Sequence, residues 1–296
     1  MPTVKIPYVL QSNERRSLLD MLEKIGSRSV AEDLKKTLLD ILSHELLNNK
    51  EFLVRYFLLA AILDQQAESE SARQTVKRVF QNYGYEFFMN PQRCFNNIHE
   101  IVRSVLDTYT PKTRIIRMKK EGITFLRIGG FMLTIHNLSY RFGGLLEYFK
   151  RYQDPFILLN KGILKEHLLS GLLYEKAARL YVGWITHLKL FVKIYGENLP
   201  ANFIPMVVNG HVVKILARTG FLESVHVERE RMIVEAERER LRIEKEVRTI
   251  KSDGDMFSID YGAFLVGVKY CHEENPDCNR CPLNTICLKN IMFRAY

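Results

Sequence analysis

The stretch Cys271-His-Glu-Glu-Asn-Pro-Asp-Cys278-Asn-Arg-Cys281-Pro-Leu-Asn-Thr-Ile-Cys287 holds four of the five cysteines of the chain. Their spacing is C-x6-C-x2-C-x5-C, and two prolines bend the chain between them. Thiolates this close together can converge on one centre, whereas two disulfides would form awkwardly in so short a loop. Four thiolates suit either a tetrahedral zinc ion or an iron-sulfur cluster with one cysteine per iron.

The spacing favours a 4Fe-4S cluster, with zinc as the alternative cofactor. Structural zinc sites usually take two tight C-x2-4-C pairs that lie far apart in sequence. Here only Cys278 and Cys281 form such a pair, and Cys271 and Cys287 lie on wider loops around it. The remaining cysteine, Cys94, is alone in sequence, and we expect it to be a small buried apolar side chain.

Composition indicates a globular protein with a polyanionic partner. The 296 residues are 47% hydrophobic and 26% charged, close to the average of soluble proteins. Lysine and arginine outnumber acidic residues by 43 to 34, which favours nucleic acid as the partner ahead of an anionic membrane surface. No secretory leader pattern and no apolar run of about 20 residues occurs. We therefore expect an intracellular monomer without a membrane partner.

Apolar residues recur at helical spacing along most of the chain, and no pair of alternating segments flanks a hairpin turn. The sequence therefore predicts an all-α protein. The expected helices cover residues 13–47 (two helices around a break at Gly26 and Ser27), 51–64, 69–83, 91–109, 131–142, 163–169, 175–195, 210–222 and, as an exposed charged helix, 225–250. We expect the glycine pairs at 129–130 and 143–144 to mark helix ends. The basic residues between 112 and 127 are a candidate phosphate-binding segment.

Three further segments carry candidate functional residues. Residues 169–177 read Leu-Ser-Gly-Leu-Leu-Tyr-Glu-Lys-Ala, a glycine turn followed by a helix start. Such a turn can expose backbone N–H groups to phosphate and bind DNA without reading its bases. Residues 207–220 read Val-Val-Asn-Gly-His-Val-Val-Lys-Ile-Leu-Ala-Arg-Thr-Gly, and residues 59–69 read Leu-Ala-Ala-Ile-Leu-Asp-Gln-Gln-Ala-Glu-Ser.

With the cysteine loop, these segments resemble, in order, the landmarks of the helix-hairpin-helix DNA glycosylases of the endonuclease III branch. They are similar to the family's L-S-x-Q-A-T-D, its hairpin L-P-G-V-G-x-K-x-A, its V-D-T-H-x-x-R-x-x-x-R-x-G and its 4Fe-4S loop. The resemblance implies a two-lobed helix-hairpin-helix fold with a C-terminal cluster loop. A central helical domain would cover residues 51–202, and residues 1–50 plus 203–296 would form the cluster domain.

The resemblance also implies a DNA repair function. The family hydrolyses the N-glycosidic bond of a damaged or mismatched base in double-stranded DNA, and its bifunctional members add AP lyase activity. In this chain the catalytic positions would be Asn209, Lys176 and Glu175. DNA contacts would fall to Gln65, Gln66, Gly171, Leu173 and His211, and the metal ligands would be Cys271, Cys278, Cys281 and Cys287.

The family's second hairpin glycine is Leu173 here, and two other departures from the family pattern bear on catalysis. The family's catalytic aspartate is Asn209 here, and a neutral amide lacks the negative charge that stabilises the developing cation on the sugar. The family's lysine column falls on Glu175, while Lys176 is one residue further, about 100° round a helix. The chain is then an enzyme that takes its carboxylate from Glu175 or Glu197, an altered or non-catalytic DNA-binding relative, or an engineered trapping variant. A further hypothesis, from a different functional class, is that the chain is a zinc-stabilised scaffold for a protein partner.

Overall fold

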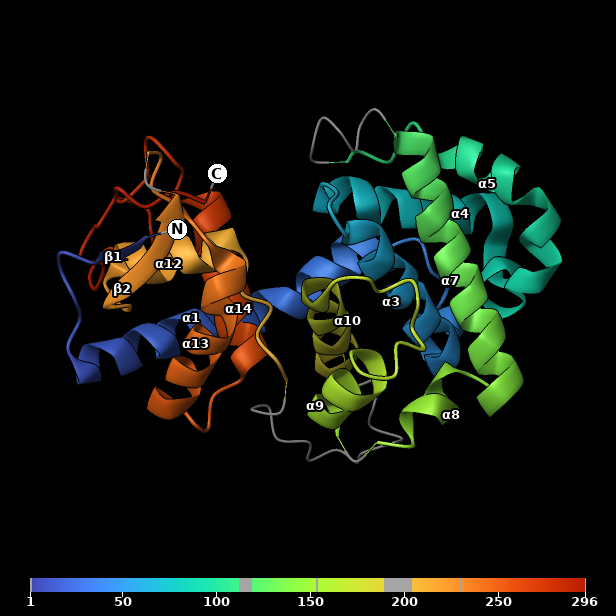
Figure 1. Cartoon of the computed structure of the whole chain (residues 1–296), viewed down its shortest axis with the longest axis horizontal. Coiled ribbons are helices and arrows are strands. Elements are labelled where there is room, and N and C mark those ends of the chain that lie inside the picture. The colour runs from blue at the N-terminus through green and yellow to red at the C-terminus, as the bar shows by residue number, and fades with distance from the viewer. Residues whose placement is uncertain (1, 112–118, 153, 189–203, 229, 296) are drawn as a thin grey trace. The chain divides into compact units, whose positions relative to one another are not determined.

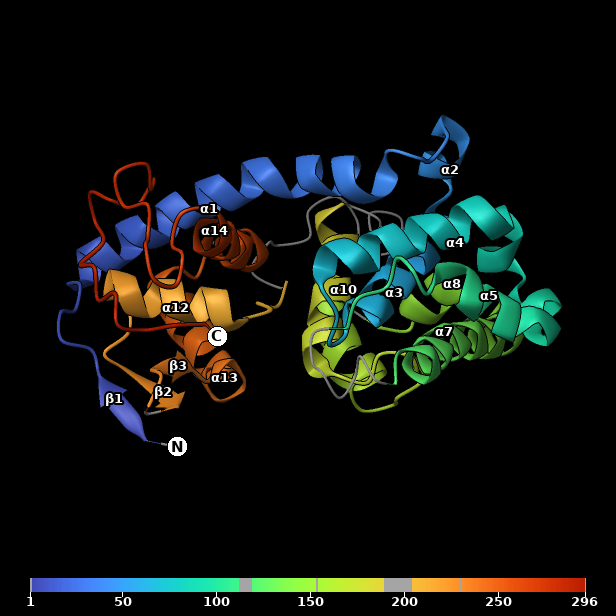
Figure 2. The ribbon, with the colours of Figure 1, turned by 90° about the horizontal axis from the view of Figure 1, so that it is seen from above.

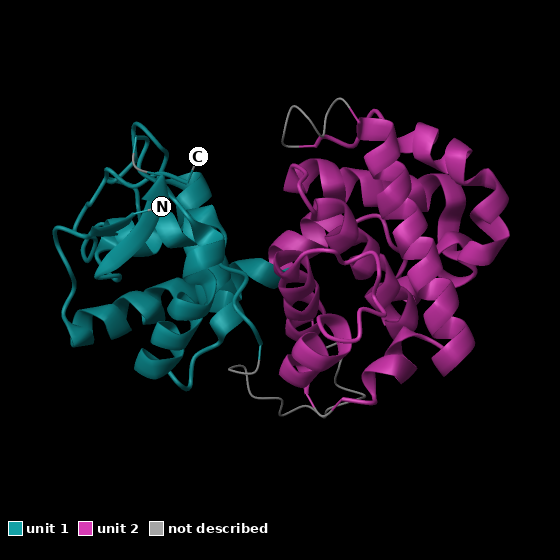
Figure 3. Cartoon of the chain, in the orientation of Figure 1, with its two compact units in different colours: residues 1–31, 200–296 teal, residues 32–199 magenta. Residues whose placement is uncertain are grey.

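A computed structural model describes residues 2–111, 119–152, 154–188, 204–228 and 230–295. Most of these residues are helical, as the sequence predicts, and a small three-stranded sheet accompanies the helices (Figure 1). The chain divides into two compact units, residues 1–31 with 200–296 and residues 32–199 (Figure 3). The cysteine loop belongs to the first unit and the glycine turn at Gly171 to the second.

The first unit combines helices with the sheet. Strand β1 pairs antiparallel with β2, which pairs antiparallel with β3. Buried Val225 and Val227 alternate with half-buried neighbours along β2, which is the pattern of a strand with one covered face. The elements are β1 (Thr3–Lys5), most of α1 (Ser12–Leu34), α12 (Gly210–Thr219), β2 (Ser224–Glu228), β3 (Ile233–Val234), α13 (Ala236–Ile250) and α14 (Met256–Lys269).

The sheet corrects the prediction of one helix over residues 225–250. The helix begins only at Ala236, and the residues before it form the antiparallel strands β2 and β3. The high density of charge hid a short strand pair. Helix α13 is also less exposed than expected, because Glu239 and Glu244 are buried against the unit.

Helix α1 runs unbroken through Gly26, where the sequence predicts a break. A Cβ atom at Gly26 would lie 1.9 Å from the carbonyl oxygen of Ser258, and one at Gly262 would lie 2.0 Å from that of Leu22. The backbones of α1 and α14 therefore touch at this crossing. Glycine serves a close approach here and not a turn.

The second unit is helical and is built around α3, whose residues Phe52 to Leu63 are all buried. Helices α4, α7 and α10 pack against it (Figures 1 and 2). The elements are η1 (Lys35–Leu39), α2 (His44–Asn48), α3 (Lys50–Asp64), α4 (Ser69–Met89), η2 (Pro91–Asn97), α5 (Ile98–Val105), α7 (Lys120–Phe142), α8 (Leu145–Phe149), α9 (Pro155–Ile157), η3 (Leu158–Ile163) and α10 (Glu175–His187).

Several predicted boundaries in this unit are wrong. Helix α7 begins at Lys120 and passes through the glycine pair at 129–130, which was expected to end a helix. A Cβ atom at Gly130 would lie 3.2 Å from the Cα atom of Gly171, so this glycine admits the turn that packs on α7. The helix expected over 163–169 lies earlier, in α9 and η3, and the one expected over 91–109 is the 3-10 turn η2 followed by the short α5.

Three predicted features fall outside the described residues. They are the basic residues at 112–118, the end of the helix expected over 175–195, and Glu197, the alternative source of a carboxylate. Across the described part of the chain, no helix combines the length and the apolar character that a bilayer crossing requires.

Candidate metal centre and hairpin site

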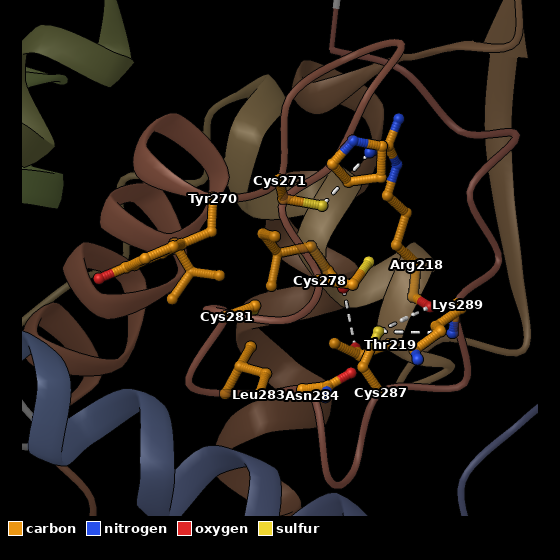
Figure 4. A pocket seen from close by; sticks show the side chains of 13 residues that line it. Arg218, Thr219, Tyr270, Cys271, Cys278, Cys281, Leu283, Asn284, Cys287 and Lys289 are labelled. Carbon is orange, nitrogen blue, oxygen red and sulfur yellow. Dashed lines mark hydrogen bonds between the residues drawn. The ribbon is translucent and has the colours of Figure 1, made fainter.

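Cys271, Cys278, Cys281 and Cys287 line a single pocket beside α12 and α14 (Figure 4). All four are half-buried free thiols. Short backbone bonds shape the loop: the N–H of Cys281 donates to the carbonyl oxygen of Cys278 at 3.3 Å, and that of Cys287 donates to Leu283 at 2.9 Å. These tight turns bring the side chains of four separated cysteines to one space. Cys94, expected to be buried, is half-buried in the other unit.

The sulfur atoms surround the pocket and do not meet at one point. Among the described residues, no three His, Cys, Asp or Glu side chains form a group that could hold a metal ion. A zinc ion needs all its ligands at one atom, at about 2.3 Å for sulfur, whereas a 4Fe-4S cluster is bound through four separate irons. Four thiols around one pocket are a donor set for either group, and the 4Fe-4S cluster and zinc both stay predictions.

Burial disfavours the thiolate form of two of these cysteines, Cys281 and Cys287, and so raises the pKa of each. It raises the pKa of Cys287 to about 11, and the neighbouring cysteines act in the same direction on both thiols. The N–H of Lys289 donates to the Cys287 Sγ atom at 3.4 Å and opposes this shift only in part. The two thiols are thus protonated at neutral pH without metal, and metal binding would release their protons.

Arg218, at the end of α12, fastens the cysteine loop. This side chain is 1% exposed. Its Nη1 atom donates to the Cys271 Sγ atom at 3.3 Å and to the carbonyl oxygen of His272 at 2.8 Å. Its Nε atom donates to the carbonyl oxygen of Phe293 at 2.6 Å, and its Nη2 atom donates to that of Glu273 at 3.0 Å. One guanidinium group therefore joins α12, the loop and the C-terminal segment.

Lys214, one helical turn earlier, makes a second attachment that the sequence analysis missed. Its Nζ atom donates to the carbonyl oxygen of Cys271 at 2.6 Å and to the Glu273 carboxylate at 2.7 Å. Burial alone would raise the pKa of Glu273, but the Lys214 ammonium and the N–H of Ala295 lower it below its ordinary value. The two cations lie four residues apart on α12, so both face the loop.

Asn209 lies at the other end of the same helix. Its Oδ1 atom accepts a hydrogen bond from the N–H of Val212 at 3.2 Å and caps α12. Asparagine and aspartate cap helices about equally well, so the local fold is compatible with either residue. His211 is half-buried and its ring packs edge-on against Phe264. Its DNA contact stays a prediction.

Gln65 fastens the glycine turn of the second unit. Its Oε1 atom accepts hydrogen bonds from the N–H groups of Leu173 at 2.8 Å and Tyr174 at 3.0 Å. Its Nε2 atom donates to the carbonyl oxygens of Gly171 at 2.8 Å and Ile62 at 3.0 Å. The side chain is 4% exposed and its hydrogen-bonding capacity is used. The predicted DNA contact of Gln65 is therefore not available to its amide, whereas Gln66 is exposed.

The turn itself offers no N–H group to phosphate between Gly171 and Tyr174. The N–H of Gly171 donates to the Thr134 Oγ1 atom at 3.3 Å, and that of Leu172 donates to the carbonyl oxygen of Leu169 at 2.8 Å. The next two bind Gln65. The prediction of exposed backbone donors is wrong for these four residues, because acceptors on α3, on α7 and in the turn occupy them. The Leu173 side chain is 65% exposed, and its contact with DNA stays a prediction.

Glu175 and Lys176 begin α10 and differ in their surroundings. The Glu175 carboxylate accepts a hydrogen bond from the Nε atom of buried Arg179 at 2.7 Å. The ammonium of Lys176 is half-buried and makes no hydrogen bond or ion pair with any residue that the structure describes. Glu175 is thus engaged in an ion pair, whereas Lys176 has no hydrogen-bond or ion-pair partner among the residues that the structure describes. The two lie in the second unit, and Asn209 lies in the first.

A comparison with protein-family models finds no match for this chain, and a comparison with curated proteins finds none either.

Replacing Arg218 tests the attachment of the cysteine loop. Arg218→Met keeps the length of the side chain but leaves several buried carbonyl groups without a donor, which should cost about 3–5 kcal/mol of unfolding free energy. Urea denaturation measures the change. Arg280→Met is the matched control, because Arg280 is an exposed arginine of the same loop, and it should leave the midpoint almost unchanged. Equal midpoints for the two variants would contradict the attachment.

Replacing Gln65 tests the fastening of the turn. Gln65→Leu removes the acceptor of two N–H groups, and we expect a loss of about 2 kcal/mol or more together with faster hydrogen exchange at Leu173 and Tyr174. Gln66→Ala serves as the control, because the neighbouring amide is exposed. If Leu173 and Tyr174 exchange at the same rate in both variants, Gln65 does not hold the turn.

Proposed function

We propose that this chain is a helix-hairpin-helix DNA glycosylase that hydrolyses the N-glycosidic bond of a damaged or mismatched base in double-stranded DNA. The proposal rests on helix α12, which has the candidate catalytic position at its start and the attachment of the cysteine loop at its end. Residue 209, at the family's catalytic position, caps the first turn, and Arg218 in the last turn binds the cysteine loop. The order of the four family-like segments and the net charge of +9 support the same reading.

The chemistry at residue 209 follows from its side chain. As the glycosidic bond breaks, positive charge develops on the sugar. The Asn209 amide oxygen is directed at the N–H of Val212 and carries no full negative charge. The chain is therefore a slow enzyme in this form. An aspartate would keep the cap and add the missing charge.

Lys176 is the proposed nucleophile for a lyase step. After the Lys176 ammonium loses a proton to solvent, the amine can attack the sugar C1′ atom while the bond from C1′ to the base breaks and the base leaves with the electron pair. The bond from C1′ to the ring oxygen then breaks, a proton passes from the nitrogen to that oxygen, and the resulting Schiff base precedes strand cleavage. Glu175 is a weaker candidate because its carboxylate binds Arg179. We assign it to the orientation of α10.

The four cysteines are the proposed ligands of a 4Fe-4S cluster. When bound, the cluster would supply four iron-thiolate bonds that cross-link the loop. The role of the protein is to hold that loop on α12 through Arg218 and Lys214. Lys269, Arg280 and Lys289 lie near the cysteines in sequence and can meet phosphate. The cluster is structural in this proposal.

A second candidate is a non-catalytic protein that binds damaged DNA. Asn209 favours it, because the family's carboxylate is absent from that position. Both candidates share the fold, the cluster and the polyanionic partner. They differ only in whether a base is released.

The Asn209→Asp variant separates the two candidates. In single-turnover assays on duplexes with modified or mismatched bases, we expect it to release base at least about a hundredfold faster than the chain with Asn209, as supplying a catalytic carboxylate does. Asn137→Asp, which adds the same charge at an exposed position of α7, should have no effect. If neither chain releases a base and both bind the duplex, the enzyme proposal fails and the binding protein stands.

Borohydride trapping on abasic DNA tests Lys176. The reagent reduces a Schiff base to a stable covalent adduct, and we expect the adduct with the parent chain and its loss in Lys176→Ala. Lys165→Ala, which removes an exposed lysine of the same unit, should form it normally. An adduct of unchanged yield in Lys176→Ala would remove this residue from the mechanism.

A further inference from the structure

The residue before Asn209 has an unusual backbone. Val208 is fully buried and has a φ angle of 48°. Four other non-glycine residues of the described chain have positive φ angles, and none of them is branched at Cβ. A β-branched side chain is strained in this region. Something in the surrounding structure must therefore hold Val208 in place.

Asp260 supplies that constraint. Its Oδ1 atom accepts a hydrogen bond from the N–H of Val208 at 2.7 Å, and the carboxylate is 3% exposed. Two side chains of α13 bind the preceding backbone: the Glu244 carboxylate accepts from the N–H of Met206 at 3.4 Å, and Arg248 donates to the carbonyl oxygen of Ile204 at 3.3 Å. Helices α13 and α14 thus fix the path of the chain into α12.

The strained residue Val208 directly precedes Asn209, the N-cap of α12. On the far side, a Cβ atom at Gly210 would lie 3.2 Å from the carbonyl oxygen of Ala295, so the turn is confined there as well. The direction of the residue 209 side chain depends on both φ and ψ of Val208. We propose that Asp260 is a positioning residue that aims the side chain at position 209, an inference that rests on the proposed function of that position.

Asp260 and Cys271 belong to one segment of the chain that contacts both ends of α12. Asp260 lies on α14, the helix that leads directly to Cys271. It holds the start of α12 through Val208, and Cys271 meets the end of α12 through Arg218. One continuous segment, residues 260–271, therefore holds α12 at both ends.

The test combines Asp260→Leu with Val208→Gly. Glycine adopts positive φ angles without strain, so it should need the carboxylate less. Asp260→Leu is expected to speed hydrogen exchange of the Val208 N–H by about tenfold or more. In the Asn209→Asp background it should lower kcat by a similar factor with little change in KM. Adding Val208→Gly should restore most of kcat, although it removes a buried side chain.

A purely structural role for Asp260 predicts the opposite result. The double variant would then be worse than either single variant, and that outcome overturns the proposal, as does unchanged exchange at Val208 in Asp260→Leu. Asp260→Asn keeps the shape with a weaker acceptor and replaces Asp260→Leu if that variant does not fold. Ser258→Ala, on the same helix, is the control and should leave Val208 exchange unchanged. Exchange decides the positioning claim even if no chain releases a base, so the two proposals fail separately.

Discussion

The buried guanidinium of Arg218 is the interaction on which the first unit depends. It binds Cys271, His272, Glu273 and Phe293 from one position, and no apolar side chain could satisfy these groups. The cation joins three segments that are far apart in sequence. One side chain of α12 thus contacts both the cysteine loop and the C-terminal segment.

The two units use the same device at their candidate catalytic positions. In each, a buried polar side chain fixes a turn just before a helix: Asp260 holds Val208 before α12, and Gln65 holds Leu173 and Tyr174 before α10. Asn209 and Lys176 then occupy the starts of these helices. A side chain on a rigid helix start is positioned more precisely than one on a free loop.

The sequence predicts what local patterns determine. The buried helix α3, the capped helix α12 and the gathering of four cysteines all follow from spacing or periodicity. The glycine pair at 143–144 marks the end of α7 as predicted, whereas Gly26 and Gly130 lie inside helices, where they serve contacts between segments distant in sequence and carry no local signal of that use. The hydrogen bonds of Gln65 with Gly171 and of Lys214 with Glu273 could not be predicted for the same reason, because the partners lie 106 and 59 residues away. The strands β2 and β3 were missed because dense charge masked a short alternation.

Metal analysis of the purified protein tests the central claim, that the loop held by Arg218 carries an iron-sulfur cluster. Iron, acid-labile sulfide and zinc would be measured together with the visible spectrum of anaerobically prepared protein. With a 4Fe-4S cluster bound, we expect about four irons and four sulfides per chain and a broad absorbance at about 400 nm. A colourless protein with one zinc ion per chain, or with no metal after cluster reconstitution, would contradict it.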